Sequence, residues 1–102
     1  MFRASTRLLD CRVTFFTRSP CSLCDTAKAV VHNVRAKRPF AYHEINVMEL
    51  GQEKWKAVYE FDTPVIHVDK SGPAETSTSS LKLMHRFSEG DVTRLMDEVE
   101  TS

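Results

Sequence analysis

The chain of 102 residues has no long run of hydrophobic residues. Its apolar stretches extend over only a few positions, whereas a helix that crosses a bilayer needs roughly 20. We therefore expect no membrane partner. The chain also lacks an internal repeat, and its 14 lysines and arginines are balanced by 14 acidic residues. A single domain over residues 1–102 is the simplest organisation for this length.

Basic and acidic residues are distributed unevenly along the chain, although its net charge is zero. Residues 1–40 contain eight basic and two acidic side chains, whereas residues 41–102 contain six basic and twelve acidic ones. Such an asymmetry occurs in nucleic-acid-binding proteins, but here no aromatic residues alternate with the basic ones to stack on bases. A solvent-exposed helix face explains the basic residues equally well. We expect no nucleic-acid partner.

Cysteine is also scarce, with three residues in the chain. Such a number is too small for a disulfide-stapled scaffold, but the Cys21-Ser-Leu-Cys24 spacing is typical of a catalytic or metal-binding pair in a reducing compartment. No second pair of this kind is present, and no histidine lies at a ligand-like spacing, so we expect no metal. Cys11 is predicted to be a small buried residue near the start of the first strand.

The first eleven residues have a composition of their own. They contain two arginines, a serine and a threonine, with no acidic residue before Asp10, as in mitochondrial targeting segments. Because a strand is expected to begin by Arg12, residues 1–11 are alternatively a plain N-terminal overhang. The cysteine pattern and this segment lead us to expect a location in the cytoplasm or the mitochondrial matrix.

Hydrophobic periodicity predicts strands that alternate with helices. Strands are expected at residues 12–17, 40–47 and 63–68, and helices at residues 20–38 and 50–59. Ser19 is expected to cap the first helix, with Pro20 in its first turn. Strands and helices in this order form a sheet with parallel pairing and right-handed crossovers.

The remaining elements complete an α/β fold. Residues 70–80, rich in serine, threonine, glycine and proline, are predicted to form a mobile loop. An antiparallel strand is expected at residues 81–84, and Ser88-Glu-Gly-Asp91 resembles a capping box that opens a last helix. The second helix is expected to carry Leu50, Trp55, Val58 and Tyr59 as its apolar residues. Trp55 and Tyr59 are interpreted as one buried face, with a substrate platform as the alternative. His67, inside the third strand, is interpreted as a structural histidine.

The two nearby cysteines have different positions relative to the first helix. Cys21 lies in its first turn, where unpaired backbone N–H groups and the helix dipole favour a thiolate. Arg18, three residues earlier, adds a positive charge. We therefore predict that Cys21 is the nucleophile and that Cys24, one turn further, is the resolving thiol of a dithiol redox centre.

Thr63-Pro64 is the second motif, 42 residues beyond Cys21. An X-Pro bond at the entrance of a buried strand is a candidate cis bond. Proline removes a donor from the sheet and presents the preceding backbone to the outside. An ordinary trans proline at the start of a strand is the alternative.

Together, these motifs and the order of elements resemble glutaredoxins over nearly the whole chain. The chain is most similar to the divergent glutaredoxin-like branch of the thioredoxin superfamily, on the basis of Cys21-Ser-Leu-Cys24, Thr63-Pro64 and the segment His85-Arg86-Phe87. The resemblance implies a thioredoxin-like fold with a four-stranded mixed sheet and three flanking helices. It also implies Cys21 as the attacking cysteine and Pro64 as a cis-proline.

The resemblance further implies a binding site for peptide or glutathione. Thr63 is expected to form backbone hydrogen bonds to the substrate, and Arg18 to lie near the glycine carboxylate of glutathione. The family's Gly-Gly pair before the last helix is missing, so Arg86 or the helix N-terminus at Ser88 is expected to receive an anionic group instead. Ser22-Leu23 also replaces the usual Pro-Tyr dipeptide. Glutathione is thus a candidate reductant, and no bound cofactor is expected.

Three functions remain open at this point. The first is a thiol-disulfide oxidoreductase that acts on a disulfide-containing protein or on a glutathione mixed disulfide. A second interpretation is a non-catalytic subunit or adaptor in a larger assembly, which binds partners at the Thr63-Pro64 edge. The third is an iron-sulfur carrier, against which a resolving Cys24 argues.

Overall fold

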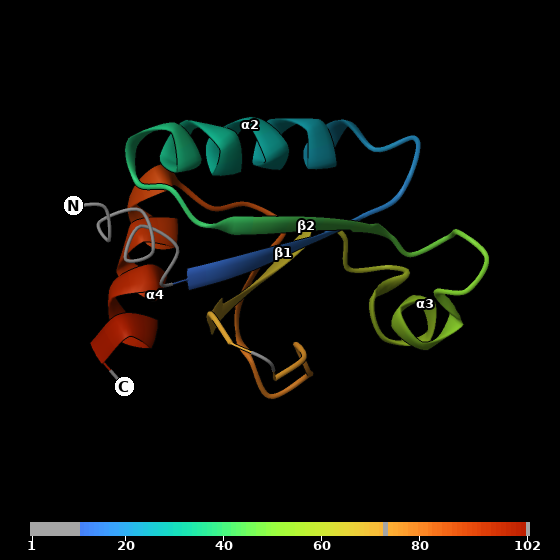
Figure 1. Ribbon diagram of the computed structural model, residues 1–102. Helices are drawn as coiled ribbons and strands as arrows, with labels where there is room; N and C mark the ends of the chain where they lie inside the picture. The colour runs from blue at the N-terminus through green and yellow to red at the C-terminus, as the bar shows by residue number, and fades with distance from the viewer. Residues whose placement is uncertain (1–10, 73, 102) are drawn as a thin grey trace.

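The computed structural model describes residues 11–72 and 74–101. The elements of this part are β1 (Cys11–Thr17), α2 (Ser22–Lys37), β2 (Ala41–Asn46), α3 (Glu53–Tyr59), β3 (Val65–Lys70), β4 (Leu81–Met84) and α4 (Glu89–Thr101) (Figure 1). The strands form one sheet in the order β2-β1-β3-β4, in which β1 is parallel to β2 and antiparallel to β3. The predicted α/β architecture is confirmed. The predicted segment before Cys11 lies outside the described residues.

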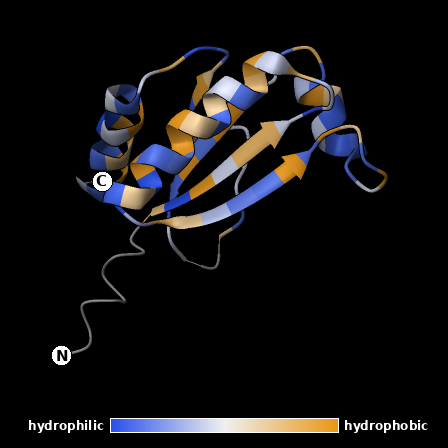
Figure 2. Cartoon of the chain, turned by 90° about the horizontal axis from the view of Figure 1, so that it is seen from above, coloured by the Kyte–Doolittle hydropathy of each residue, from blue (hydrophilic) through white to orange (hydrophobic). Residues whose placement is uncertain are grey.

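One face of the sheet is covered by α2 and α4. Val13 and Phe15 of β1 are fully buried against apolar side chains of these helices, including Val31 and Met96. Figure 2, which looks down on this side of the sheet, shows hydrophobic and hydrophilic residues mixed along α2 and along the strands beneath it. Burial of this apolar area is the main contribution to stability on this face.

The opposite face of the sheet packs against α3. Phe16, one position after Phe15, points to this side because side chains alternate along a strand. Its ring centroid lies 4.7 Å from that of Trp55 and 5.1 Å from that of Tyr59. Trp55 and Tyr59 are buried, as predicted, and keep only 7% and 3% of their surfaces exposed.

The second helix is shorter than predicted. It begins at Glu53, because residues 49–51 form a turn in which Gly51 has a φ of +92°. The predicted inclusion of Leu50 in this helix is wrong, and its side chain is 95% exposed. Val58 lies in the helix, as predicted, with 41% of its surface exposed. A helix of seven residues places only one stripe, here Trp55 and Tyr59, against the sheet.

The start of the first helix also differs from the prediction. Ser19 is not its cap, because the helix begins at Ser22 and Cys21 is the N-cap residue. Cys21 has an extended backbone, with φ −161° and ψ 100°, while its carbonyl oxygen already accepts from the Asp25 N–H at 3.2 Å. Pro20 therefore precedes the helix, and the Ser19-Pro20 bond is cis.

His67 is a structural histidine, as predicted, and it joins β3 to the loop before β4. Its Nε2 lies 2.6 Å from the Tyr59 hydroxyl and its Nδ1 lies 2.8 Å from Thr76 Oγ1. Thr76 contacts the Ser80 hydroxyl, which donates to the Asp69 carboxylate. Because Asp69 can only accept, the chain of donors runs from Tyr59 to Asp69 and gives His67 a neutral Nδ1–H tautomer.

This hydrogen-bonded chain satisfies a histidine that is fully buried. Burial lowers the pKa of His67 to about 4, and the positive charge of Lys82 acts in the same direction. The loop between β3 and β4 is thus attached to the sheet at two positions, Thr76 and Ser80. The mobility predicted for residues 70–80 stays a prediction.

The last helix opens with the predicted capping box. The Ser88 N–H donates to Asp91 Oδ2 at 2.9 Å, and the Asp91 N–H donates to Ser88 Oγ at 3.1 Å. The first of these bonds lowers the pKa of the Asp91 carboxyl. None of the helices in the described residues is long and apolar enough to span a membrane.

Candidate redox site

Three chain segments meet at one edge of the sheet. In the pairing register, Phe16 at the end of β1 lies opposite Val65 at the start of β3, and Val65 lies opposite Met84 at the end of β4. The segment that leads from β1 to Cys21, the segment before β3 with Pro64, and the segment after β4 with His85 therefore leave the sheet at the same edge. Figure 1 shows the connections from β1 to α2 and from β2 to α3 at this end.

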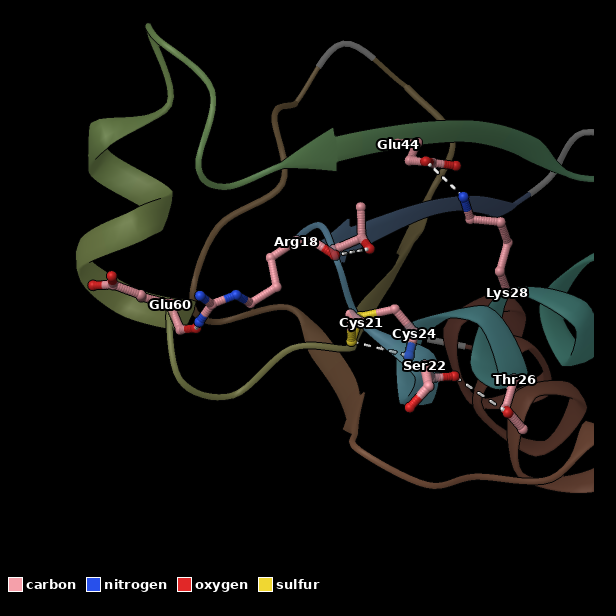
Figure 3. The surroundings of a disulfide bond; sticks show 9 residues. Arg18, Cys21, Ser22, Cys24, Thr26, Lys28, Glu44 and Glu60 are labelled. Atoms are coloured by element: carbon pink, nitrogen blue, oxygen red, sulfur yellow. Dashed lines mark hydrogen bonds and ion pairs between the residues drawn. A yellow bond between two sulfur atoms is a disulfide. The ribbon is translucent and has the colours of Figure 1, made fainter.

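Cys21 and Cys24 form a disulfide at the N-terminus of α2 (Figure 3). Their Cα atoms are 5.2 Å apart, as one helical turn requires. The backbone N–H of Cys24 donates to Cys21 Sγ at 3.1 Å, so the sulfur takes the place of a capping oxygen. In the reduced protein, the same N–H group and the helix dipole would stabilise a Cys21 thiolate.

The two sulfur-bearing residues differ in accessibility. Cys24 is only 1% exposed and belongs to the core between α2 and the sheet, whereas Cys21 is partly exposed at the edge of that core. An incoming disulfide therefore reaches Cys21 first. Such a difference is what a pair composed of an attacking and a resolving thiol requires.

The Thr63-Pro64 bond is cis, as the resemblance to glutaredoxins implies. Pro64 is buried and Thr63 is partly exposed beside it. The carbonyl oxygen of Pro64 accepts from the backbone N–H of His85 at 2.7 Å. The loop before β3 is thereby joined to the segment after β4. The binding role of Thr63 stays a prediction.

Arg18 is attached to the end of α3. Its Nη1 donates to the carbonyl oxygen of Glu60 at 2.9 Å, and Figure 3 shows the side chain extended from the cysteine segment toward Glu60. The bond joins the residues before Cys21 to the loop that leads to Thr63. The expected contact of Arg18 with glutathione stays a prediction.

Arg86 lies in the wall of a cavity beside the disulfide. This cavity has a volume of about 200 Å³ and is lined by Leu23, Thr26, Ala27, His85, Arg86 and Phe87. Leu23, which lies between the two cysteines in the sequence, is part of this wall, whereas neither cysteine is among the lining residues. The cavity's apolar side chains and single guanidinium suit a ligand with an apolar body and an anionic end. Arg86 was predicted to bind such an anionic group, and this role stays a prediction.

Sequence patterns did not identify two residues near this edge as exposed apolar side chains. Phe61, two positions before Thr63, is 86% exposed, and Leu50, before α3, is 95% exposed. A signal for Phe61 was present, because it is a large aromatic residue between Glu60 and Asp62 and belongs to no periodic apolar face.

The third cysteine is remote from the redox pair. Cys11 begins β1, at the opposite end of the strand from the segment that leads to Cys21, and it is buried, as predicted. Its sulfur lies 3.3 Å from Glu100 Oε2. Within residues 11–72 and 74–101, no group of three or more His, Cys, Asp or Glu side chains is arranged to hold a metal ion.

Comparison with known protein families gives one match over most of the chain. The family model described as Glutaredoxin-like domain (DUF836) matches residues 12–97. This range includes both cysteines, Thr63-Pro64 and the segment His85-Arg86-Phe87.

Solved structures of thioredoxins are similar in fold. A mutant thioredoxin from Halobacterium salinarum NRC-1 is 18% identical with a TM-score of 0.67, covering 92% of this chain and 78% of that one. Oxidised thioredoxin O2 from Arabidopsis thaliana is 16% identical with a TM-score of 0.62, covering 95% and 84%. Oxidised mitochondrial thioredoxin 3 from Saccharomyces cerevisiae is 16% identical with a TM-score of 0.59, covering 99% and 87%. At these identities the similarity establishes a thioredoxin-like fold.

Proposed function

Because the chain belongs to the family of glutaredoxin-like domains, we propose that it is a thiol-disulfide oxidoreductase that cycles Cys21 and Cys24 between dithiol and disulfide. The observation that carries the proposal is the position of the disulfide: Cys21 is the partly exposed N-cap of α2, and its sulfur accepts from the backbone N–H of a buried Cys24. A buried structural disulfide would need neither accessibility nor a helix N-terminus.

The reaction proceeds in two exchanges. The Cys21 thiolate attacks one sulfur of a substrate disulfide, forms a mixed disulfide with it, and releases the other sulfur as a thiolate. The Cys24 thiolate then attacks Cys21 Sγ, which releases the second substrate thiolate and forms the Cys21–Cys24 disulfide. Two electrons have passed to the substrate. Two external thiols, with glutathione as the candidate, reduce the protein again.

The surrounding residues have separate tasks in this cycle. Thr63 presents its backbone to an extended substrate, and the cavity lined by Leu23 and Arg86 receives an anionic group. Arg18 places positive charge on the segment before Cys21. A reducing compartment, the cytoplasm or the mitochondrial matrix, suits a cycle whose disulfide must be reduced repeatedly.

The test is the reduction of bis(2-hydroxyethyl) disulfide by glutathione in the presence of the protein. Wild type is expected to accelerate the reaction, and Cys21→Ser to abolish the acceleration. Cys24→Ser is expected to accumulate a mixed disulfide on Cys21, detected by intact mass. Unchanged turnover in Cys21→Ser would contradict the proposal. Absence of turnover in wild type would favour the second candidate, an adaptor that uses the exposed edge around Thr63-Pro64.

A further inference from the structure

Large apolar side chains are exposed mainly in one region. Among the described residues, those with more than about a third of their surface exposed are Met48, Leu50, Val58, Phe61 and Leu81. All except Leu81 lie within residues 48–61. Met48, Leu50, Val58 and Phe61 are called the apolar rim below. Exposed apolar residues concentrated in this way mark interaction surfaces, whereas single ones are ordinary.

The loops that carry most of the apolar rim are attached to the segment that leads to the redox site. The loop that carries Met48 and Leu50 is attached to the end of β1, where the Val47 N–H donates to the Thr17 carbonyl oxygen at 2.9 Å. The loop that carries Phe61 is attached one residue further along, where Arg18 donates to the Glu60 carbonyl oxygen. Both loops are therefore bonded to the segment that leads to Cys21.

The rim is also flanked by acidic residues. Glu49 precedes Leu50, and Phe61 lies between Glu60 and Asp62. Residues 48–62 carry four carboxylates, at Glu49, Glu53, Glu60 and Asp62, against two basic side chains, Lys56 and the exposed Lys54, whose Nζ lies 5.1 Å from the centroid of the Trp55 ring. A partner on this surface consequently meets apolar side chains bordered by carboxylates.

We propose that the apolar rim binds a polypeptide substrate that carries apolar and basic side chains beside its disulfide. This inference rests on the proposed function and names its substrate class. Leu50 and Phe61 lie before and after α3, whose seven residues span about 10 Å. A tripeptide bound at Cys21 would not cover both ends of such a surface.

Two symmetric peptide disulfides and one small disulfide form the test set. The first peptide is acetyl-Lys-Phe-Cys-Leu-Lys-amide, the second is acetyl-Glu-Ala-Cys-Ala-Glu-amide, and the small neutral probe is bis(2-hydroxyethyl) disulfide. Rates are measured with the reduced protein, and each is divided by the rate of dithiothreitol with the same probe. This ratio removes differences in the leaving thiol.

Wild type is expected to favour the basic, apolar peptide over the acidic one by about tenfold or more. Phe61→Ala and Leu50→Ala are expected to reduce this preference, and Glu60→Gln to reduce it in a salt-dependent way. Leu81→Ala is the matched control, because Leu81 is an exposed leucine at the other end of the sheet, paired with Val68.

The outcomes separate this inference from the proposed function. If wild type reduces all three probes with equal normalised rates, the inference is overturned and the proposed function stands. An equal loss of preference in Leu81→Ala and Phe61→Ala also overturns the inference. If wild type reduces none of the probes, both are overturned.

Discussion

The backbone N–H of His85 donates to the carbonyl oxygen of Pro64 at 2.7 Å, and this bond joins two segments of the redox edge that are 21 residues apart. His85 adopts a φ of +66°, the left-handed conformation that side chains other than glycine rarely adopt. The turn places Arg86 and Phe87 in the wall of the cavity beside the disulfide. The conformation of one residue thus positions part of the site.

Substitutions at His85 test this conformation. His85→Gly is expected to leave the free energy of unfolding unchanged or to raise it by up to about 1 kcal/mol, because glycine adopts positive φ without a steric penalty. His85→Val is expected to lower it by about 1–2 kcal/mol, because a β-branched side chain is disfavoured there. Urea denaturation of the oxidised protein measures both. His85 Nε2 also lies 3.8 Å from Asp62 Oδ1, and a less stable glycine variant would show that this contact matters more than the backbone conformation.

Helix capping gives a second prediction. Its control is Ser19, which was predicted to cap the first helix but does not. Ser88→Ala removes the oxygen that accepts from the Asp91 N–H and is expected to cost about 1 kcal/mol of unfolding free energy. Ser19→Ala is expected to cost much less, because Ser19 does not cap α2. Urea midpoints of the two variants measure the contrast. Equal losses would contradict this assignment of the caps.

The buried histidine predicts how stability depends on pH. The pKa of His67 is lowered to about 4 by burial and by Lys82, below an unfolded value of about 6.5. The unfolded chain therefore binds a proton first as the pH falls, and the contribution of neutral His67 is present above pH 6.5 and is lost toward pH 4. The expected loss is about 3 kcal/mol at pH 4.

The measurement compares free energies of unfolding at pH 7 and pH 4 in wild type and His67→Gln. The variant is expected to be less stable at pH 7, since its amide must replace the bonds to Tyr59 and Thr76, and to depend less on pH. His43→Gln, which alters an exposed histidine, serves as the control and should keep the wild-type dependence. A His67→Gln variant with the full wild-type slope would show that other groups titrate.

Arg18 gives a fourth prediction, which separates charge from hydrogen bonding. Arg18→Met removes the bond to the Glu60 carbonyl oxygen and is expected to lower the free energy of unfolding by about 1–2 kcal/mol. It should also slow the reaction of reduced Cys21 with bis(2-hydroxyethyl) disulfide. Arg18→Lys keeps the charge and is expected to restore most of the rate. If the Arg18→Lys and Arg18→Met variants react equally slowly, the geometry of the guanidinium matters and its charge does not.

The strands and the cysteine pair were predictable because their signals are local. Runs of β-branched and aromatic residues predicted β1, β2 and β3, and the resemblance to glutaredoxins implied the cis bond at Pro64, which the proline alone left open. The start of α2 was not predictable from capping preferences, because a cysteine sulfur replaces the usual serine oxygen. N-cap preferences, which favour side chains with an oxygen acceptor, therefore assign the cap of this helix to Ser19.

Exposure near the redox edge was harder to predict. Leu50 was assigned to the second helix, but this helix begins only at Glu53, and the sequence pattern does not indicate that start. Likewise, the bond from Arg18 to Glu60 joins residues 42 positions apart. Contacts of this kind depend on how α3 is placed on the sheet, which periodicity does not describe.

The role of Cys21 as the attacking thiol is tested most directly by the pH dependence of its alkylation. Reduced Cys24→Ser protein is treated with iodoacetamide from pH 5 to pH 10, and modification of Cys21 is followed by peptide mass, which separates it from Cys11. We predict a pKa for Cys21 below the ordinary thiol value of about 8.5, because the residue is the N-cap of α2. A pKa at or above that value, together with no turnover in wild type, would contradict the account.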